Sequence, residues 1–358
     1  MPKKVLFLVP YPLNEAPSQR FRFEQYFELL IRNDIEFKVQ PFLSVKKSKI
    51  FFSPGRLIDK GLVLLVGIFL RIKMIIHTTH FDYIFIHREA APVGPPLFEW
   101  ILARVLKKKI VFDFDDAIWL SDQQETKLAS LIKCRNKVKK ITSWAYRISA
   151  GNSVLSGYAY KYNSNVVLNP TTIDTNWHNP EKFKIKKDTS EIIVGWTGSH
   201  STLKYLSILE PVLQSISRKF KHVEFLIIAD KPPPLKLQSL TFVPWNEATE
   251  ISDLMRIDIG IMPLPDDQWS RGKCGFKLLQ YLSLEIPAVA SPVGVNTSII
   301  EDGVNGFLAN TQEEWENALT TLIKDPTLRS RMGKKGREKV IERYSVSSNS
   351  SNFLSLFD

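Results

Sequence analysis

A chain of 358 residues is longer than a single hydrophobic core usually supports, so two domains are expected. With 44% apolar and 24% charged residues, no low-complexity tract and no solenoid-type repeat, its composition is that of a folded globular protein. The two cysteines, Cys134 and Cys274, can form neither a disulfide framework nor a metal-ligand cluster, which indicates a cytoplasmic location.

The net charge of +11 is unevenly distributed along the chain. Residues 1–169 contain 26 Lys and Arg against 14 Asp and Glu, whereas the remainder is close to neutral. Two basic clusters, "RVLKKK" at 104–109 and "KCRNKVKK" at 133–140, are either solvated helix faces or contacts to an anionic membrane surface on the inner face of the plasma membrane. Nucleic-acid binding is not expected, because the clusters lack interleaved aromatic residues and a recognition-helix motif.

Short apolar runs alternate with amphipathic stretches in the first half. The opening "MPKKVLFLVPYP" has an apolar run too short for a signal-peptide core and is predicted to be the first strand. Residues 61–76 are too few to span a membrane and include Arg71 and Lys73. The alternation indicates a parallel sheet with helices on both faces. Strands are expected near Val5–Val9, Phe37–Gln40, Tyr83–His87, Ile110–Asp113 and Tyr146–Ser149.

A polar, proline-containing stretch then breaks the pattern. It begins at Val166, and we predict a linker at residues 170–190. Alternation resumes in "EIIVGWTGSHSTLKYL", "VEFLIIAD", "LTFVPW", "IDIGIMPLP" and "IPAVASPVG". The expected fold class is α/β, with Rossmann-like doubly wound sheets at residues 1–169 and 191–340 facing a central cleft, and residues 341–358 returning as a helix toward the first domain.

The segment "RGKCGFKLLQ" is predicted to bind a phosphate or diphosphate group. Gly272 and Gly275 lie in a turn before a helix that begins near Phe276, so free backbone N–H groups and the helix dipole meet there. Lys273 and Lys277 add two ammonium groups. A plain helix start explains so short a pattern equally well, and the order of the surrounding motifs has to decide.

Three stretches around this segment occur in a recognisable order: "VVLNPTTID", "IIVGWTGSHSTLKYL" and "GFKLLQYLSLEIPAVASPVGVNTSIIEDGVNGFLA". They are similar to an interdomain "P-N-G-x-D" region, to the opening strand and glycine turn of a donor domain, and to a donor-site helix followed by a "P-V-V-A-S" strand and an "E-D-G-x-N-G-F-L" segment. In this order they resemble the retaining GT-B glycosyltransferases of family 4, the glycosyl transferases group 1 type that builds bacterial surface polysaccharides and glycolipids. The resemblance covers nearly the whole chain.

The resemblance implies which residues hold a nucleotide-sugar donor. Gly198 and Ser199 would lie under the diphosphate, and Lys204 would neutralise it. Gln280 stands where the family usually has the second glutamate of its E-x7-E motif, which holds the ribose. The implied donor-binding residues are Gly198, Ser199, Val243, Trp245, Lys273, Gly275, Phe276 and Gln280, and the implied catalytic contacts are Lys277, Lys204 and His87.

Two positions depart from the family pattern. Gly272 stands where the first glutamate of E-x7-E is expected, and Ser199 stands where an arginine commonly follows the glycine. Because of the first difference, the group that contacts the transferred sugar is not assigned. A degenerate relative that binds nucleotide or glycan without catalysing transfer therefore remains an alternative. The second shifts phosphate neutralisation onto Lys204, Lys273 and Lys277.

Three carboxylates follow a strand in "KKKIVFDFDDAIW", namely Asp113, Asp115 and Asp116. The pattern is compatible with the metal site of a GT-A glycosyltransferase or with the nucleophile loop of a haloacid-dehalogenase-like phosphatase. The tandem sheets argue against the first, and Ala117, where the phosphatase pattern has Thr or Val, argues against the second. Cations of the protein neutralise the diphosphate in a GT-B enzyme, so no metal and no cofactor are expected.

The first half is then predicted to bind the acceptor. Its clustered carboxylates either hydrogen-bond acceptor hydroxyls or form a structural network with arginines, including Arg88. The other arginines follow the first strand and either meet a phosphate or form surface salt bridges. The candidate acceptor-binding residues are Arg20, Arg22, Glu89, Asp115 and Asp116.

The expected function is transfer of a sugar, with retention of configuration, from a nucleotide-diphosphate sugar to a hydroxyl of a glycan or lipid-linked acceptor in surface polysaccharide synthesis. Leaving-group stabilisation by Lys204 and Lys277 would lower the barrier. His87, at the end of a strand, is similar in place to the cleft-facing histidine of some family members. The alternatives are a nucleotide-sugar epimerase on the same fold and the degenerate binding protein.

Overall fold

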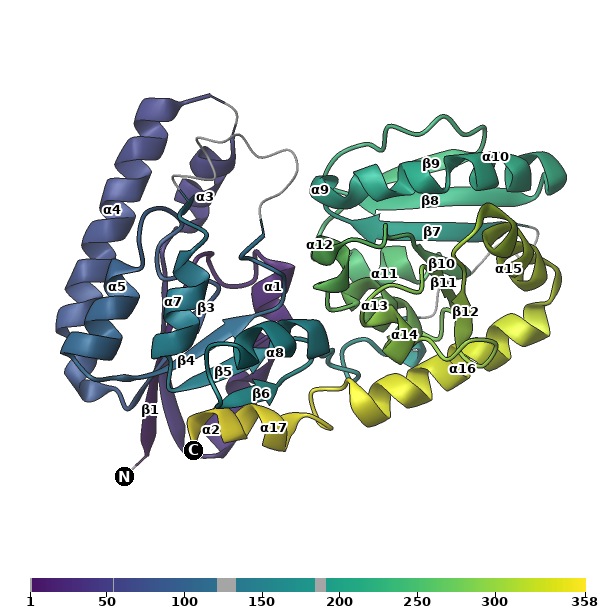
Figure 1. Ribbon diagram of the computed structural model, residues 1–358. Helices are drawn as coiled ribbons and strands as arrows, with labels where there is room; N and C mark the ends of the chain where they lie inside the picture. Colours follow the sequence, from purple (N-terminus) through teal and green to yellow (C-terminus); the bar gives the residue numbers. More distant parts are fainter. Residues whose placement is uncertain (1, 54, 121–132, 184–190) are drawn as a thin grey trace. The chain divides into compact units, whose positions relative to one another are not determined.

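The computed structural model describes residues 2–53, 55–120, 133–183 and 191–358 (Figure 1). They form two compact units, Met1–Thr171 together with Asn349–Asp358, and Thr172–Ser348. Each unit contains a six-stranded sheet whose neighbouring strands are all parallel. The predicted α/β fold class with two doubly wound sheets is confirmed.

The sheet of the first unit has the strand order β2-β1-β3-β4-β5-β6. The five strands predicted from apolar runs are confirmed as β1 to β5, whereas the interpretation of the stretch from Val166 as irregular is wrong, because it opens with strand β6. The order reverses direction between β1 and β3, so ligands are expected at the carboxyl ends of these two strands. The strands are β1 Lys3–Val9, β2 Ile35–Pro41, β3 Tyr83–His87, β4 Lys109–Phe114, β5 Arg147–Ala150 and β6 Val166–Leu168.

Aromatic side chains fill the core of the first unit. Phe7 of β1 lies with its ring centroid 4.8 Å from that of Phe85 on β3. The last ten residues complete this core, since Phe353 stacks on Tyr26 at 4.1 Å and Phe357 contacts the same phenylalanine cluster. The helices are α1 Pro17–Arg20, α2 Phe27–Arg32, α3 Val45–Phe52, α4 Leu57–Ile76, α5 Leu97–Trp100 with a π-helical turn at Ile101–Val105, α7 Lys137–Trp144, α8 Ser153–Tyr160 and α17 Ser350–Leu354.

The sheet of the second unit has the order β12-β11-β10-β7-β8-β9. Strand β7 comes first in the sequence, and the order reverses direction between β7 and β10. The carboxyl ends of β7 and β10 are therefore the expected ligand position in this unit. The strands are β7 Ile192–Gly198, β8 Val223–Ala229, β9 Leu240–Pro244, β10 Ile259–Met262, β11 Ala288–Ala290 and β12 Gly306–Leu308.

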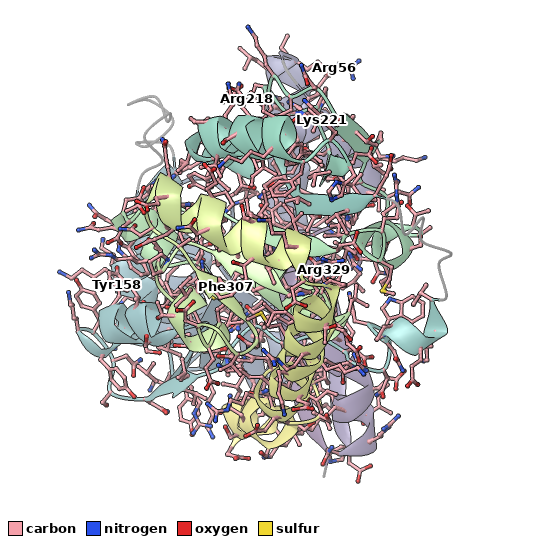
Figure 2. The ribbon with its side chains drawn as sticks, turned by 90° about the vertical axis from the view of Figure 1, so that its right-hand side faces the viewer. Arg56, Tyr158, Arg218, Lys221, Phe307 and Arg329 are labelled. Carbon is pink, nitrogen blue, oxygen red and sulfur yellow. The ribbon has the colours of Figure 1, made fainter. Side chains whose placement is uncertain are left out.

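Helices cover both faces of the second sheet (Figure 1). Helix α15 packs against α10 and β11, and α13 packs against α16 and β10. Arg329 of α16, labelled in Figure 2, donates hydrogen bonds of 2.6 and 3.1 Å to the carbonyls of Leu322 and Ile323 and so caps the end of α15. The helices are α9 His200–Leu203, α10 Glu210–Lys219, α11 Glu250–Leu254, α12 Gln268–Arg271, α13 Phe276–Ser283, α14 Asn296–Ile299, α15 Gln312–Lys324 and α16 Pro326–Arg343.

Part of the predicted linker belongs to the second unit. Ile173 forms an isolated parallel bridge with Ser345, and Arg337 of α16 donates a hydrogen bond of 2.8 Å to the carbonyl of His178. Residues 184–190 of the predicted linker lie outside the described residues. Within the part of the chain that the structure describes, no helix has the length and apolar character needed to cross a bilayer.

Candidate functional site

The carboxyl end of β7 brings together two of the residues predicted for the donor. Strand β7 ends at Gly198, and the side chain of Lys277 passes directly over it. A Cβ atom at Gly198 would lie only 2.7 Å from Cε of Lys277 and 2.6 Å from Trp196 Cη2. The ammonium group of Lys277 lies 5.1 Å from the centroid of the buried Trp196 ring. Absence of a side chain at Gly198 is therefore what lets Lys277 cross the strand end.

The helix that carries Lys277 begins as predicted. Gly275 has a positive φ of 68° and precedes Phe276, the first residue of α13. Glycine suits this left-handed position, and a Cβ atom there would also lie 2.4 Å from Cδ1 of Ile299. The amino end of α13 thus puts the positive end of the helix dipole on the same helical turn as Lys277. This combination suits an anion.

Two other predicted donor residues are joined by a carboxylate that sequence reasoning missed. Gln280 is buried in α13, and Trp245 follows β9. The Gln280 amide and the Trp245 indole both donate to Oε1 of Glu250, over 3.2 and 3.1 Å. Glu250 opens α11 and is itself buried. Nothing in the sequence distinguishes it from Glu247 nearby, since both precede an amphipathic stretch.

We expect Glu250→Ala to destabilise the second unit, because it leaves the buried amide of Gln280 and the half-buried indole of Trp245 without their acceptor. An unmade hydrogen bond of a buried donor costs about 1–3 kcal/mol, so the free energy of unfolding should fall by at least that amount. Chemical denaturation followed by tryptophan fluorescence measures the change. Glu247→Ala, at an exposed position of the same loop, is the matched control. Equal stability of the two variants would contradict the assigned role of Glu250.

The remaining predicted donor residues lie on the same unit. Ser199 follows β7 and its hydroxyl is 2.9 Å from that of Ser201. The ammonium of Lys204 lies 5.6 Å from the Tyr205 ring centroid, and that of Lys273 lies 5.9 Å from the Trp269 ring centroid. Val243 is in β9, paired with Ile228 of β8. Among the predicted donor-binding residues, Gly198 thus contacts Lys277, and Trp245 is linked to Gln280 through Glu250.

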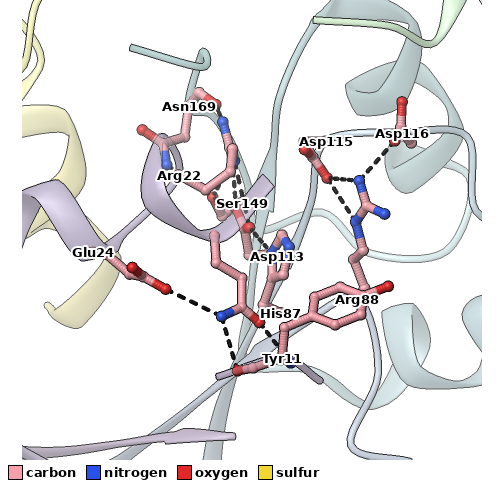
Figure 3. A network of polar contacts seen from close by, with 11 residues as sticks. Tyr11, Arg22, Glu24, His87, Arg88, Asp113, Asp115, Asp116, Ser149 and Asn169 are labelled. Carbon is pink, nitrogen blue, oxygen red and sulfur yellow. Dashed lines mark hydrogen bonds and ion pairs between the residues drawn. The ribbon is translucent and has the colours of Figure 1, made fainter. Parts of the chain in front are cut away.

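In the first unit, the three aspartates of the sequence motif have two different sets of partners (Figure 3). Asp113 is fully buried and forms an ion pair with Arg22. It also accepts hydrogen bonds from Ser149 Oγ at 2.6 Å and from Nδ1 of His87 at 2.7 Å. Burial alone would raise the pKa of Asp113, but the charge of Arg22 and the hydrogen bond from His87 outweigh it and hold the pKa well below its usual range.

This network places Arg22 in the interior. Its guanidinium is 1% exposed and donates to the carbonyl of Asn169 and, over 3.2 Å, to Ser149 Oγ as well as to Asp113. A guanidinium so placed neutralises Asp113 rather than reaching a ligand at the surface. The placement favours a structural role for Arg22 over the predicted acceptor contact.

Asp115 and Asp116 both pair with Arg88, which follows β3 (Figure 3). Nε of Arg88 donates to Asp115 over 2.9 Å, and Nη2 donates to Asp116 over 2.7 Å. Arg88 has a positive φ of 60°, an uncommon backbone conformation for a residue with a side chain. The two carboxylates raise the pKa of Arg88 despite its burial. Of the arginines proposed as their partners, the structure selects Arg88.

Tyr11 lies just beyond the carboxyl end of β1, the strand that pairs with β3. The side chain of Gln19 holds its backbone, accepting from the Tyr11 N–H over 2.9 Å and donating to the Tyr11 carbonyl over 3.0 Å. Burial raises the pKa of the Tyr11 hydroxyl, and Arg88 partly opposes the shift. Tyr11 and Arg88 therefore stand at the two strands between which the order reverses, where a ligand is expected. Tyr11 could not be identified from the sequence, because a tyrosine after a strand is common.

Glu89 and Arg20 have partners of different kinds. Glu89 pairs with Lys137 over 2.6 Å, and Lys137 also donates to the carbonyl of Ala91 over 2.9 Å. The guanidinium of Arg20 lies 5.0 Å from the ring centroid of Phe21. Lys137 is thus withdrawn from the basic cluster at residues 133–140 into the interior.

His87 ends β3 but is completely buried. Its Nδ1 bonds Asp113, its ring lies 5.6 Å from that of Phe23, and its Nε2 has no hydrogen-bond partner among the described residues. A ring without exposed surface makes no direct contact with solvent-borne substrate in this conformation. Its position indicates that His87 orients Asp113 and the neighbouring Arg88.

Arg71 holds the carboxyl ends of β1 and β2 together. It was not predicted from the sequence as a residue of the site. It projects from α4 and is fully buried. It donates to the carbonyl of Val9 at 3.1 Å, of Gln40 at 2.8 Å and of Ala90 at 2.8 Å. Burial lowers the pKa of Arg71 to about 9. A single side chain therefore ties together the carboxyl ends of β1 and β2 and the loop after β3.

Comparison with protein families gives a match to the family described as Glycosyl transferases group 1 over residues 180–339. The matched residues lie in the second unit and include β7, Gly198, Glu250 and α13. No curated protein sequence matches the chain.

Comparison with solved structures gives GT-B proteins that align along the whole chain. A glycosyltransferase from Rickettsia africae ESF-5 is 13% identical with a TM-score of 0.73, covering 99% of this chain and 98% of that one. Sucrose-phosphate synthase from Thermosynechococcus elongatus is 13% identical with a TM-score of 0.68, covering 100% and 98%. Anabaena HepE in complex with UDP and glucose is 15% identical with a TM-score of 0.66, covering 99% and 98%. The fold is that of the GT-B proteins.

Proposed function

We propose that this chain, a transferase whose residues 180–339 match the glycosyl transferases group 1, moves a sugar from a nucleotide-diphosphate sugar to a hydroxyl of a glycan or lipid-linked acceptor. The observation that carries the proposal is the passage of Lys277 over Gly198 at the carboxyl end of β7, beside the amino end of α13. HepE, a protein of the same fold, has been solved with UDP-glucose, which supports this class of donor.

In the proposed reaction the bond between the anomeric carbon and the diphosphate breaks, and a bond to the acceptor oxygen forms as that hydroxyl loses its proton. The diphosphate gains negative charge as it leaves. The Lys277 ammonium and the positive end of the α13 helix dipole stabilise that charge, and we propose that Lys204 and Lys273 of the same unit add to it. We propose that the configuration of the sugar is retained, as the sequence resemblance implies.

Trp245, Val243 and Gln280 are proposed to hold the nucleoside. The shared bond of Trp245 and Gln280 to Glu250 fixes both side chains on adjoining elements. Gln280 then offers its amide toward ribose hydroxyls in place of the glutamate that the family usually has. Gln280 replaces the family's glutamate, but its amide donates to Glu250. A carboxylate is therefore still present next to residue 280.

The carboxyl ends of β1 and β3 in the first unit are the proposed acceptor site. Arg88, held by Asp115 and Asp116, and the half-buried Tyr11 present charged and polar groups there. Such groups suit sugar hydroxyls or an acceptor phosphate. TarM, another protein of this fold, has been solved with UDP, fondaparinux and α-GlcNAc-glycerol, which supports a glycan as acceptor.

We expect Gly198→Ala to weaken donor binding, because the added Cβ atom meets the Lys277 stem and the Trp196 ring and the stem has to move. A displacement of about 1 Å at a reacting group costs up to roughly a hundredfold in rate, so kcat/KM should fall by tenfold or more. Titration with nucleoside diphosphate and steady-state kinetics measure the effect. Gly157→Ala, where nothing lies within 4 Å of the added atom, is the matched control.

The function is tested by incubating the protein with a panel of nucleotide sugars, with and without a lipid-extract acceptor. Nucleotide release that depends on acceptor supports transfer. Conversion of the donor without acceptor identifies an epimerase, and saturable binding without turnover identifies a protein that only binds. The anomeric configuration of the product, determined by NMR, tests retention. We propose that the reaction takes place in the cytoplasm and needs no metal ion. Loss of activity in EDTA that is restored by Mg²⁺ would contradict the proposed metal independence.

A further inference from the structure

Helix α4 exposes most of its surface, and that surface is apolar. Only one narrow stripe of the helix is buried, made by Val63, Gly67, Arg71 and Ile75. The remainder, here called the α4 face, consists mainly of large aliphatic and aromatic side chains. Its six most exposed members are Leu57 at 83%, Ile58 at 82%, Leu62 at 57%, Leu65 at 64%, Phe69 at 65% and Ile76 at 69%.

The buried stripe fixes the rotation of α4 about its axis. Arg71 is bonded to three backbone carbonyls at the strand ends. Gly67 packs so closely on Phe42 that a Cβ atom would lie 2.4 Å from the ring. The helix cannot roll to bury the α4 face without breaking these contacts. A contiguous apolar surface of this kind on a folded protein marks an interaction site.

The charge around the α4 face selects the partner. Residues 44–80, which comprise α3, α4 and their flanks, contain seven Lys and Arg and a single acidic residue, Asp59. Lys46, Lys49 and Lys73 are exposed. An apolar helical face bordered by lysines is the composition of helices that lie in the plane of a membrane interface and bind anionic lipid.

The two basic clusters at residues 104–109 and 133–140, which are either solvated helix faces or membrane contacts, are by contrast partly used within the first unit. Lys108 donates to the carbonyl of Phe81 over 2.8 Å, and the Lys109 ammonium lies 4.6 Å from the ring centroid of Tyr146. Lys137 is buried against Glu89. These contacts withdraw charge from the two clusters, whereas the lysines of α3 and α4 are exposed beside apolar side chains.

We propose that the α4 face docks on an anionic lipid bilayer, with the helix parallel to the membrane plane and its apolar side chains in the headgroup region. Arg71 ties this helix to the ends of β1 and β2 and to the loop before Glu99, next to Arg88 and Tyr11. Docking therefore brings these strand ends, the proposed acceptor site, close to the lipid surface. Resting on the proposed function, this assigns the acceptor to the membrane-resident class of glycolipids.

The test measures cosedimentation of the full chain with extruded vesicles of phosphatidylcholine alone or with about 30% phosphatidylglycerol. The wild type is expected to bind the anionic vesicles, and more weakly as salt rises. Leu65→Glu/Phe69→Glu should lower the partition coefficient at least about tenfold, because two apolar side chains no longer enter the interface. Val304→Glu/Ile341→Glu, which changes exposed apolar residues of the second unit, should bind like the wild type.

A second variant, Lys46→Gln/Lys49→Gln/Lys73→Gln, leaves the apolar side chains unchanged and should lose the preference for anionic vesicles. Absence of wild-type binding, or unchanged binding by the Leu65/Phe69 variant, overturns the proposal. Sedimentation velocity without lipid provides the other decisive result: a wild-type dimer that the Leu65/Phe69 variant dissociates would show that a second copy covers the face. Vesicle binding is measured without sugar nucleotide, so its failure leaves sugar transfer to a soluble acceptor separately testable.

Discussion

Replacing Lys277 by alanine should reduce turnover by about 10²–10³-fold while the second unit remains folded. The side chain leaves the first turn of α13, crosses Gly198 and ends over the Trp196 ring, at the strand end where a departing diphosphate would be held. A charge that develops during the reaction is stabilised by a preorganised cation far more than the ground state is, so the loss should appear mainly in kcat. Acceptor-dependent release of nucleoside diphosphate, followed over a range of donor concentrations, measures it.

The control is Lys231→Ala, which removes an exposed lysine from the same unit. It changes the net charge equally and should leave kcat and KM close to the wild-type values. Lys277→Arg keeps the charge, but its planar, wider head has to pass the same narrow space over Gly198, so only partial activity is expected. If Lys277→Ala turns over as fast as Lys231→Ala, Lys277 does not stabilise the leaving diphosphate and the assignment is refuted.

The sheets could be predicted from the sequence because their longer strands are apolar runs separated by amphipathic stretches. Strands β1 to β5 fall where the runs predict them, within one or two residues at their ends. Strand β6 did not emerge, because three residues beside a proline-containing stretch show no periodicity. Its place at the edge of the sheet depends on pairing with β5 across the intervening helix α8, which a local sequence pattern does not reveal.

The start of α13 was equally predictable, because a glycine turn followed by a helical pattern is a local signal. Gly275 has the left-handed conformation that the turn needs. The crossing of Lys277 over Gly198 is different, since it joins residues almost eighty positions apart and depends on how α13 packs against β10 and β7. The family resemblance suggested both residues, and the packing supplies the physical reason for the glycine.

Charge pairing could not be predicted residue by residue. The sequence offered three arginines for the aspartates, and each choice was consistent with the composition. The end of β4 at Phe114 decides the outcome: Asp113 lies within the strand and is buried, where Arg22 lies, whereas Asp115 and Asp116 follow the strand, where Arg88 lies. Glu250 was missed for the same reason, because only the fold brings its carboxylate between Trp245 and Gln280.

Asp113→Ala should destabilise the first unit by about 3–5 kcal/mol, because it leaves the Arg22 guanidinium buried without a counter-charge. Both side chains of the pair are 0% exposed, so water cannot take the place of the carboxylate. Urea denaturation at pH 7 measures the change in the free energy of unfolding. Glu28→Ala removes the partner of Arg32 in an exposed pair and should have little effect.

The pH dependence separates loss of the charge from loss of packing. The pKa of Asp113 is held below its usual range in the folded protein, so the unfolded chain takes up the proton first as the pH falls. The stabilisation is complete above the unfolded pKa of about 4 and is lost at lower pH. Asp113→Asn should therefore show a smaller loss of stability between pH 7 and pH 3 than the wild type. Arg22→Met/Asp113→Leu, which removes both charges, should recover much of the stability lost in Asp113→Ala, and failure to do so would show that the hydrogen bonds of Ser149 and His87 to Asp113 contribute more than the ion pair.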